Sequence, residues 1–345
     1  MTERDVIAGH RKGSVTIVGA GILGVWQAIE LARAGFDVQL LERARVPFSD
    51  AASRYAGAMI APYCEAEAAP AVVRDFGLAA ARLWRTHFPD LVENGSLVVA
   101  GARDLSELRR FARMTTGHEA IDGARIADLE PDLADRFQSA LFFPDEAHMA
   151  TPEALETLLR LAQSAGAKTT FDCTWDPDGA RSADWVIDCR GMAARDVLPE
   201  LRGVRGERLI IRSGGVRLNR AVRLLHPRHP LYVVPWPDGL FMVGATVIES
   251  EDTSDMTVRS ALELMGLVYA LHPGFGEAEI VEMSAGIRPS FPDNVPKAIV
   301  DRNAQIVRVN GAYRHGFLLA PVLADVVRQI VEGEALHAHP LVVMT

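Results

Sequence analysis

The sequence predicts a mixed α/β and α+β fold in which two domains are interleaved along the chain. Three observations lead to this prediction. Residues 14–42 read as a strand, turn, helix and second strand, a parallel-sheet pattern returns near residue 150, and residues 207–248 read as short strands separated by Gly, Pro and Asp. The first two predict one discontinuous domain with a parallel sheet, and the third predicts a second domain with an antiparallel sheet.

The first unit contains the glycine spacing of a dinucleotide-binding turn. A β-branched run over residues 14–18 is followed by Gly19, Gly21 and Gly24. Gly19 would permit the tight turn, Gly21 would let the backbone approach a pyrophosphate, and Gly24 would let the helix sit against the strand. A glycine triplet alone is a weak signal, because many loops contain one, so the flanking elements have to support it.

The helix and the second strand that such a turn requires are both present in the pattern. The helix begins near Ile22 and Leu23, whose backbone amides would hold the pyrophosphate, and Gly35 ends it. Glu42 stands at the tip of the next strand, 18 positions beyond Gly24 (42 minus 24), close to the roughly 20-residue offset of an acid that binds an adenosine ribose. A Rossmann-like nucleotide-binding unit is therefore predicted.

The rest of the chain continues with helical and strand patterns. After a long irregular stretch over residues 43–71, the elements expected up to residue 188 are helices at 72–87, 105–115 and 151–166, the last capped by Thr151, and strands at 168–173 and 185–188. The elements expected after residue 207 are strands at 208–212, 221–225, 232–236, 240–243, 279–283, 298–300 and 306–309, and helices at 256–271 and 317–332.

This order of elements divides the chain into two domains. The nucleotide-binding domain is expected to comprise residues 14–75, 150–205 and 285–335, and the second domain residues 76–149 and 206–284. A flavin ring needs a second wall, and ligands bind readily between domains, so the interleaving favours FAD over NAD. Two alternatives stay open: an NAD-dependent dehydrogenase that binds NAD through Glu42, and a flavin-binding protein without turnover.

Composition and charge narrow the class of protein. The chain has 345 residues, 49% hydrophobic and 23% charged, as in a globular enzyme, and its formal net charge of −9 argues against a nucleic-acid partner. The residues before position 14 are polar and the apolar run after them is too short to span a membrane, so we expect a cytoplasmic protein. The three cysteines form no CxxC pair and the histidines are scattered, which predicts reduced thiols and no metal site.

A small-residue loop over residues 55–65 is one candidate for the wall of a flavin site. Such a loop lets backbone pass close to a flat ring, although a buried connection between elements has the same composition. Ser53, just before it, is a candidate phosphate ligand because a short hydroxyl can reach an oxygen at the sheet edge.

Two segments near the end of the chain carry candidate charges. Arg288 is expected directly after a strand, where its planar guanidinium could bind a carboxylate, while composition alone favours a surface arginine in an ion pair. Gly316 and Phe317 would present free amides at the start of the last helix, with Arg314 completing a cationic wall, and the alternative is a plain glycine turn.

Together these segments resemble the FAD-dependent D-amino-acid oxidase superfamily, and within it the ThiO-type glycine oxidases of thiamine biosynthesis. The resemblance covers nearly the whole chain, and its later segments are more specific than the glycine turn. The segments that carry it are residues 19–42, 56–62, 188–191, 232–235, 243–246, 286–289 and 314–321.

The resemblance implies roles on the substrate side. Arg288 would bind the substrate carboxylate, Tyr232 would add a hydroxyl to it, Arg314 would line the same cavity, and Met59 would lie beside the flavin ring. Val247 stands where a methionine can line the pocket, which leaves room for substrates somewhat larger than glycine.

On the cofactor side, the resemblance implies FAD bound without a covalent link. Glu42 and Arg43 would serve the adenosine, Ser53 the phosphates and the amides of residues 316–318 the flavin carbonyl, while Gly191 would let the returning chain pass close to the cofactor. The residues expected to contact FAD are Gly19, Gly21, Ile22, Leu23, Gly24, Glu42, Arg43, Ser53, Ala58, Met59, Gly191, Arg288, Arg314, His315, Gly316, Phe317 and Leu318.

The activity that the resemblance implies is oxidation of a small amino acid, first of all glycine, to its imine by hydride transfer from Cα to the flavin, with oxygen reduced to hydrogen peroxide. Positioning of Cα would supply most of the catalysis, since no dedicated base is needed for a neutral amine. Alternatives are sarcosine or D-alanine as substrate, and a D-amino-acid dehydrogenase that passes electrons to a quinone. A weak homo-oligomer is a further expectation of the family.

Overall fold

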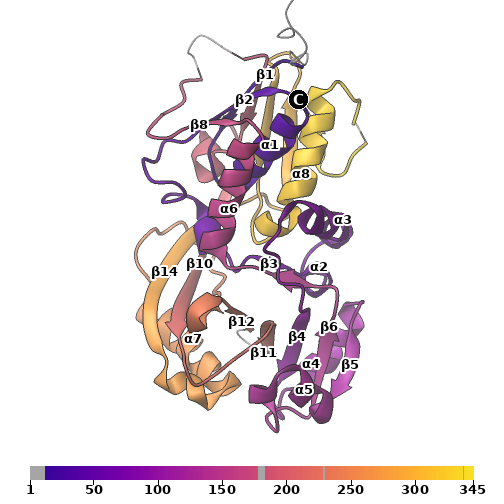
Figure 1. Ribbon diagram of the computed structural model, residues 1–345, viewed down its shortest axis with the longest axis vertical. Helices are drawn as coiled ribbons and strands as arrows, with labels where there is room; N and C mark the ends of the chain where they lie inside the picture. The colour runs from indigo at the N-terminus through magenta and orange to yellow at the C-terminus, as the bar shows by residue number, and fades with distance from the viewer. Residues whose placement is uncertain (1–11, 178–182, 228–229, 337) are drawn as a thin grey trace, which may run out of the picture.

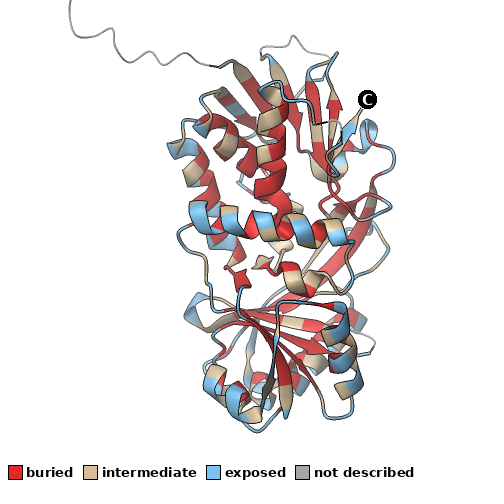
Figure 2. Cartoon of the chain, turned by 90° about the vertical axis from the view of Figure 1, so that its right-hand side faces the viewer, coloured by how far each residue is buried: buried red, intermediate tan, exposed pale blue. Residues whose placement is uncertain are grey.

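Two large sheets follow one another along the long axis of the molecule (Figure 1). The computed structural model describes residues 12–177, 183–227, 230–336 and 338–345, so most of the polar N-terminal stretch lies outside the described residues. One sheet is largely parallel and the other largely antiparallel, which confirms the predicted fold class. Buried residues lie in the strands of both sheets and along the helices that pack beside the first sheet (Figure 2).

The first sheet has seven strands in the order β17-β15-β16-β9-β1-β2-β8. All neighbours are parallel except the antiparallel pair β15 and β16. The strands are β1 (Ser14–Val18), β2 (Asp37–Leu41), β8 (Lys168–Thr170), β9 (Trp185–Asp188), β15 (Lys297–Asp301), β16 (Ile306–Asn310) and β17 (Val342–Met344). Because β1 pairs with both β2 and β9, the glycine turn that follows it lies near the middle of the sheet edge, where nucleotides bind in such folds.

Three helices, α1 (Ile22–Arg33), α6 (Thr151–Ser164) and α8 (Gly316–Val331), pack together beside this sheet (Figure 1). Almost the whole of α1 is buried, because its side chains pack against the sheet, α6 and α8. Helix α3 (Ala71–His87) covers α8 from outside, and the Trp84 indole donates a hydrogen bond of 2.8 Å to the carbonyl oxygen of Phe317. The start of α8 is therefore held by two other helices.

The second sheet has eight strands in the order β14-β10-β13-β12-β11-β4-β6-β5, antiparallel except for the parallel pair β11 and β4. Its strands are β4 (Ser96–Ala100), β5 (Glu119–Asp122), β6 (Ser139–Phe143), β10 (Arg202–Arg212), β11 (Ala221–Leu225), β12 (Leu231–Pro235), β13 (Leu240–Gly244) and β14 (Glu279–Ser290). Helices α5 (Gly123–Leu129) and α7 (Val258–Leu271) share one apolar core with this sheet, and α4 (Leu105–Met114) shares another. The expected domain boundaries after residues 205 and 284 fall inside β10 and β14, so each of these strands continues from one expected domain into the other.

The structure corrects several sequence-based expectations. The stretch 43–71 is not wholly irregular, since it holds a 3₁₀ turn (Ala52–Tyr55), the short strand β3 (Met59–Ile60), which pairs with β7 (Ala147–His148), and the short helix α2 (Pro62–Glu65). Strands β4, β5 and β6 were not predicted. Thr151 is not the cap of α6 but its first residue, and its hydroxyl instead donates a 2.5 Å hydrogen bond to the carbonyl of Ala56.

No helix in the described ranges is both long and apolar enough to cross a membrane.

Candidate active site

The predicted glycine turn is present, and two of its glycines are required by the protein's own atoms. Gly19 has φ +96°, and a Cβ added there would lie 2.6 Å from the carbonyl oxygen of Cys189 on the neighbouring strand connection. A Cβ on Gly24 would lie 1.9 Å from the carbonyl oxygen of Gly19. These contacts let α1 start directly behind β1, which places the amino end of α1 at the sheet edge.

Gly21 has a different status, because nothing in the protein itself requires a glycine there. Its φ is −72°, and an added Cβ would make only ordinary contacts, 3.8 Å from Ser53 Oγ and 3.9 Å from Ala51 Cβ. Ser53 Oγ also accepts a hydrogen bond of 3.3 Å from the Ile22 amide at the start of α1. The lack of a side chain at Gly21, the α1 amides and the Ser53 hydroxyl together fit a pyrophosphate.

Glu42 ties the two strand tips of this unit together. One carboxylate oxygen accepts a hydrogen bond of 2.7 Å from the Ala20 amide, and the other accepts one of 3.0 Å from the Ala44 amide. The remaining lone pairs of this carboxylate fit the ribose hydroxyls expected of an acid in this position. Arg43 is an exposed residue whose guanidinium lies 3.6 Å from the Asp50 carboxylate.

The expected flavin-facing segments come from separate parts of the chain. Ala58 is buried with φ +48°, and Met59 follows it in β3 and packs against apolar side chains of both the α2 region and strands β12 and β13. Gly191, with φ +59°, begins a 3₁₀ turn (Gly191–Asp196) after β9, and its carbonyl accepts a 2.9 Å hydrogen bond from Asn310 Nδ2. Neither position suits a bulky residue with its backbone as it is.

The start of α8 presents its backbone rather than its side chains. Phe317 and Leu318 are buried in the core, and within the part of the chain that the structure describes no side chain caps this helix end. The first amides of a helix carry a partial positive charge, so residues 316–318 fit an acceptor such as a flavin carbonyl. His315 stands at the cap position, but its ring is buried and its Nδ1 lies 3.3 Å from Glu65 Oε2.

Arg288 lies inside β14, not directly after a strand as expected, because β14 continues to Ser290. It is opposite Val204 in β10, and its guanidinium passes over Gly206, where an added Cβ would lie 1.9 Å from Nη2. Its Nη1 donates a hydrogen bond of 3.1 Å to the Thr246 carbonyl, and no carboxylate among the described residues forms an ion pair with it. The surface ion pair considered as an alternative is therefore wrong.

Tyr232 and Arg314 lie close enough to Arg288 to act electrostatically on its guanidinium. The Tyr232 ring packs against Gly57, where an added Cβ would lie 3.1 Å from Cε2. Burial lowers the pKa of Arg288, and the positive charge of Arg314 lowers it further. Arg314 itself lies 3.7 Å from the Glu65 carboxylate, whose negative charge raises the pKa of the guanidinium.

Sequence reasoning missed two residues of this site. Gly206 is an isolated glycine within a strand pattern, which can signal close approach of another group, and that signal was available. Glu65 gave no signal, because its partners Arg314 and His315 are about 250 positions away in sequence. Val247, considered as a pocket residue, is 48% exposed. No group of three or more metal-ligating side chains gathers within the described ranges.

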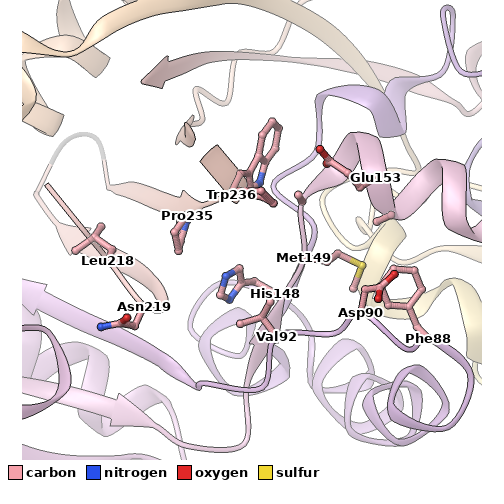
Figure 3. A pocket seen from close by; sticks show the side chains of 13 residues that line it. Phe88, Asp90, Val92, His148, Met149, Glu153, Leu218, Asn219, Pro235 and Trp236 are labelled. Atoms are coloured by element: carbon pink, nitrogen blue, oxygen red, sulfur yellow. The ribbon is translucent and has the colours of Figure 1, made fainter. Parts of the chain in front are cut away.

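A separate cavity of about 440 Å³ lies between the start of α6 and strand β12 (Figure 3). His148, Met149 and Trp236 are among the residues that line it, and burial lowers the pKa of His148 to about 4. None of the predicted catalytic residues lines this cavity, so it is distinct from the cluster around Arg288.

A Rossmann-like unit, a second sheet next to it and a cationic cluster at Arg288 and Arg314 form the arrangement expected of an FAD-dependent oxidoreductase. Comparison with known proteins agrees with this class: the chain belongs to the DAO family of FAD dependent oxidoreductases, whose family model matches residues 14–330. The enzyme class and the family expected from the sequence are thereby confirmed, and the NAD-dependent alternative is set aside.

Particular relatives resemble the chain over most of its length. The chain is 47% identical over 319 residues to the "Putative thiamine biosynthesis oxidoreductase ThiO" of Rhizobium etli, covering 92% of this chain and 96% of that protein. It is 26% identical to the glycine oxidase of Pseudomonas aeruginosa, covering 92% and 94%. The crystal structure of glycine oxidase from Bacillus cereus matches 96% of this chain and 99% of that one, with a TM-score of 0.81 at 20% identity.

Proposed function

We propose that this protein oxidises glycine, or an amino acid close to it in size, to the imine, using noncovalent FAD and oxygen, in the service of thiamine biosynthesis. The observation that carries the proposal is Arg288, a partly buried guanidinium without a carboxylate partner among the described residues. Such a charge is costly unless a ligand pairs with it, and a substrate carboxylate matches its planar geometry. The names of the Rhizobium etli and Pseudomonas aeruginosa relatives support the pathway and the substrate.

The residues of the cluster would divide the work by position. Arg288 would hold the carboxylate with two parallel hydrogen bonds, and Tyr232 would add its hydroxyl on the β12 side. Fixing the carboxylate in this way fixes Cα, because only one bond separates them in an amino acid. FAD, when bound, supplies the acceptor for the Cα hydride, and the α8 amides at residues 316–318 would stabilise the negative charge that this transfer produces nearby.

The state of the two buried cysteines supports a noncovalent cofactor. Cys64 and Cys189 are buried, and burial raises the pKa of both thiols, which keeps them protonated and weakly nucleophilic. Denaturation of the yellow protein should therefore release all of its flavin into the supernatant. Flavin that stays with the precipitated chain would contradict this part of the proposal.

The test of the activity is an anaerobic absorbance titration of the purified holoenzyme with glycine, followed by admission of air. We expect the flavin bands to bleach with glycine and to return in air with formation of hydrogen peroxide. Bleaching without peroxide would indicate another electron acceptor such as a quinone. A yellow protein that glycine does not bleach, but that sarcosine or D-alanine does, would correct the substrate.

A further inference from the structure

We infer that Glu65 sets the substrate class of this site by neutralising Arg314, so that Arg288 is left as a single free cation and the site accepts amino acids with one carboxylate while it rejects dicarboxylates. This inference rests on the proposed function, since it assumes that Arg288 binds the substrate carboxylate. Nothing in the family match assigns a role to Glu65.

The contacts around Glu65 show where its charge is directed. Its two carboxylate oxygens face different partners: Oε1 lies 3.7 Å from Arg314 Nη2, and Oε2 lies 3.3 Å from His315 Nδ1. The Glu65 and Arg314 side chains are only 20% and 22% exposed, so solvent screens the pair weakly. Burial alone would raise the pKa of Glu65, but Arg314, His315 and, to a smaller extent, Arg223 outweigh it and hold that pKa well below its usual value. Glu65 is therefore ionised at neutral pH.

The backbone keeps Glu65 in this position. Glu65 is the last residue of α2, which begins at Pro62, and its amide donates a 3.0 Å hydrogen bond to the Ala61 carbonyl. The preceding residue, Cys64, donates its amide hydrogen to the buried Glu146 carboxylate over 2.8 Å. Both bonds restrain the backbone at the end of α2, so the Cα of Glu65 stays beside the start of α8 when a ligand enters.

The charge balance of the cluster then limits the ligand. Arg288 and Arg314 carry two positive charges, and Glu65 carries one negative charge that also acts on Arg288. One substrate carboxylate balances the single positive charge that remains. A second carboxylate of a ligand would find Arg314 already paired, and the negative charge of Glu65 would repel it. The site would therefore reject dicarboxylates through an unfavourable contact as well as through poor fit.

The test measures ligand binding to the holoenzyme by calorimetry, with acetate as the monocarboxylate and malonate, succinate and iminodiacetate as dicarboxylates. In the native protein acetate should bind at least as tightly as any of the three. In Glu65→Gln, at least one dicarboxylate should gain about tenfold in affinity relative to acetate, the change expected for one new charge-assisted hydrogen bond to Arg314. The ratio of kcat/KM for iminodiacetate over that for glycine should rise in parallel.

Glu67→Gln is the matched control. Glu67 is two residues away and pairs with Arg110 at 2.7 Å and Arg223 at 3.2 Å, so its loss removes the same charge without releasing Arg314. Glu65→Asp retains the carboxylate and should retain the native preference. Should Glu65→Gln not fold, Arg314→Gln should weaken acetate binding about tenfold, because Glu65 would then repel the ligand beside Arg288.

Two results would overturn the inference: an unchanged preference in Glu65→Gln, or an equal gain in Glu67→Gln. The binding measurement also separates this inference from the proposed function. If glycine proves not to be oxidised, acetate and the dicarboxylates still report which carboxylates the Arg288 site accepts.

Discussion

The proposed substrate site depends first on one side chain, Arg288. Its guanidinium has a backbone carbonyl as partner and lies beside Tyr232. We expect Arg288→Ala to lower kcat/KM for glycine about 100-fold, since a lost charge-assisted hydrogen bond pair is worth roughly 3 kcal/mol, and to leave the flavin absorbance in place. Steady-state kinetics and the absorbance spectrum measure both. A colourless Arg288→Ala protein would mean that this arginine serves the cofactor instead.

Gly206 is a residue whose importance comes from the space above it. A Cβ at this position would lie 1.9 Å from Arg288 Nη2, so in Gly206→Ala the guanidinium has to move. We expect the Michaelis constant for glycine to rise at least tenfold, a shift of about 1.4 kcal/mol, with the flavin still bound. Steady-state kinetics measure this shift.

Gly266→Ala is the matched control for this change. Gly266 lies in α7, where an added Cβ meets nothing within 4 Å, so alanine should leave the kinetics unchanged and stabilise the helix by about 0.5–1 kcal/mol. Equal Michaelis constants for Gly206→Ala and the native enzyme would show that the arginine does not need this space.

At the scale of elements, a hydrogen bond joins the start of α6 to the loop that precedes Met59. The Thr151 hydroxyl at its start donates to the Ala56 carbonyl over 2.5 Å. We expect Thr151→Val, which keeps the shape but removes the donor, to lower the free energy of unfolding by roughly 1–3 kcal/mol because a partly buried carbonyl loses its partner. Urea unfolding measures it. Thr151→Ser retains the hydroxyl and should keep most of the stability, and equal losses in the two variants would exclude the hydrogen bond as the cause.

Some elements could be predicted from sequence patterns and others could not. The unit from β1 to β2 was predictable because contacts within and next to the unit itself require two of its glycines, Gly19 and Gly24. The length of β14 was not, because Gly286 and Pro289 resemble the end of a strand. β14 lies at the edge of its sheet, where a proline needs no partner on its outer side, so the strand continues and Arg288 lies within it.

Contacts between segments that are distant in sequence are a second feature that could not be predicted from the sequence. Glu65 was an unremarked residue in a small-residue loop, and its meaning comes from Arg314 and His315, which the fold brings to it from the start of α8. Strands β4 and β6 do contain apolar runs of strand-forming residues, but their place in the sheet depends on distant partners, since β4 pairs in parallel with β11 from the other half of the sheet. Propensity within one segment carries no information about such partners.

At the scale of the whole molecule, Glu146 joins α2 to the antiparallel sheet. This fully buried carboxylate accepts hydrogen bonds from the Cys64 amide and from the Ser96 hydroxyl at the start of β4. Burial raises its pKa from 4.5 to about 7, although both hydrogen bonds act in the opposite direction. The protein therefore keeps a proton on Glu146 at pH values where the unfolded chain has lost it.

This difference predicts how stability depends on pH. Well below pH 4.5 Glu146 is protonated in the folded and the unfolded state, so it does not change the free energy of unfolding with pH. As pH rises from 4.5 to about 7, Glu146 ionises in the unfolded state alone, so the free energy of unfolding falls, by about 3 kcal/mol in total. Above this range Glu146 is ionised in both states and the free energy of unfolding levels off. Glu146→Gln cannot ionise and should lack this fall. Urea unfolding of both holoenzymes at intervals from pH 4.5 to 8 measures it: the native free energy of unfolding should decline relative to that of the variant across this window. Parallel profiles would mean that Glu146 is ionised in the folded protein, held by the two hydrogen bonds that link α2 to β4.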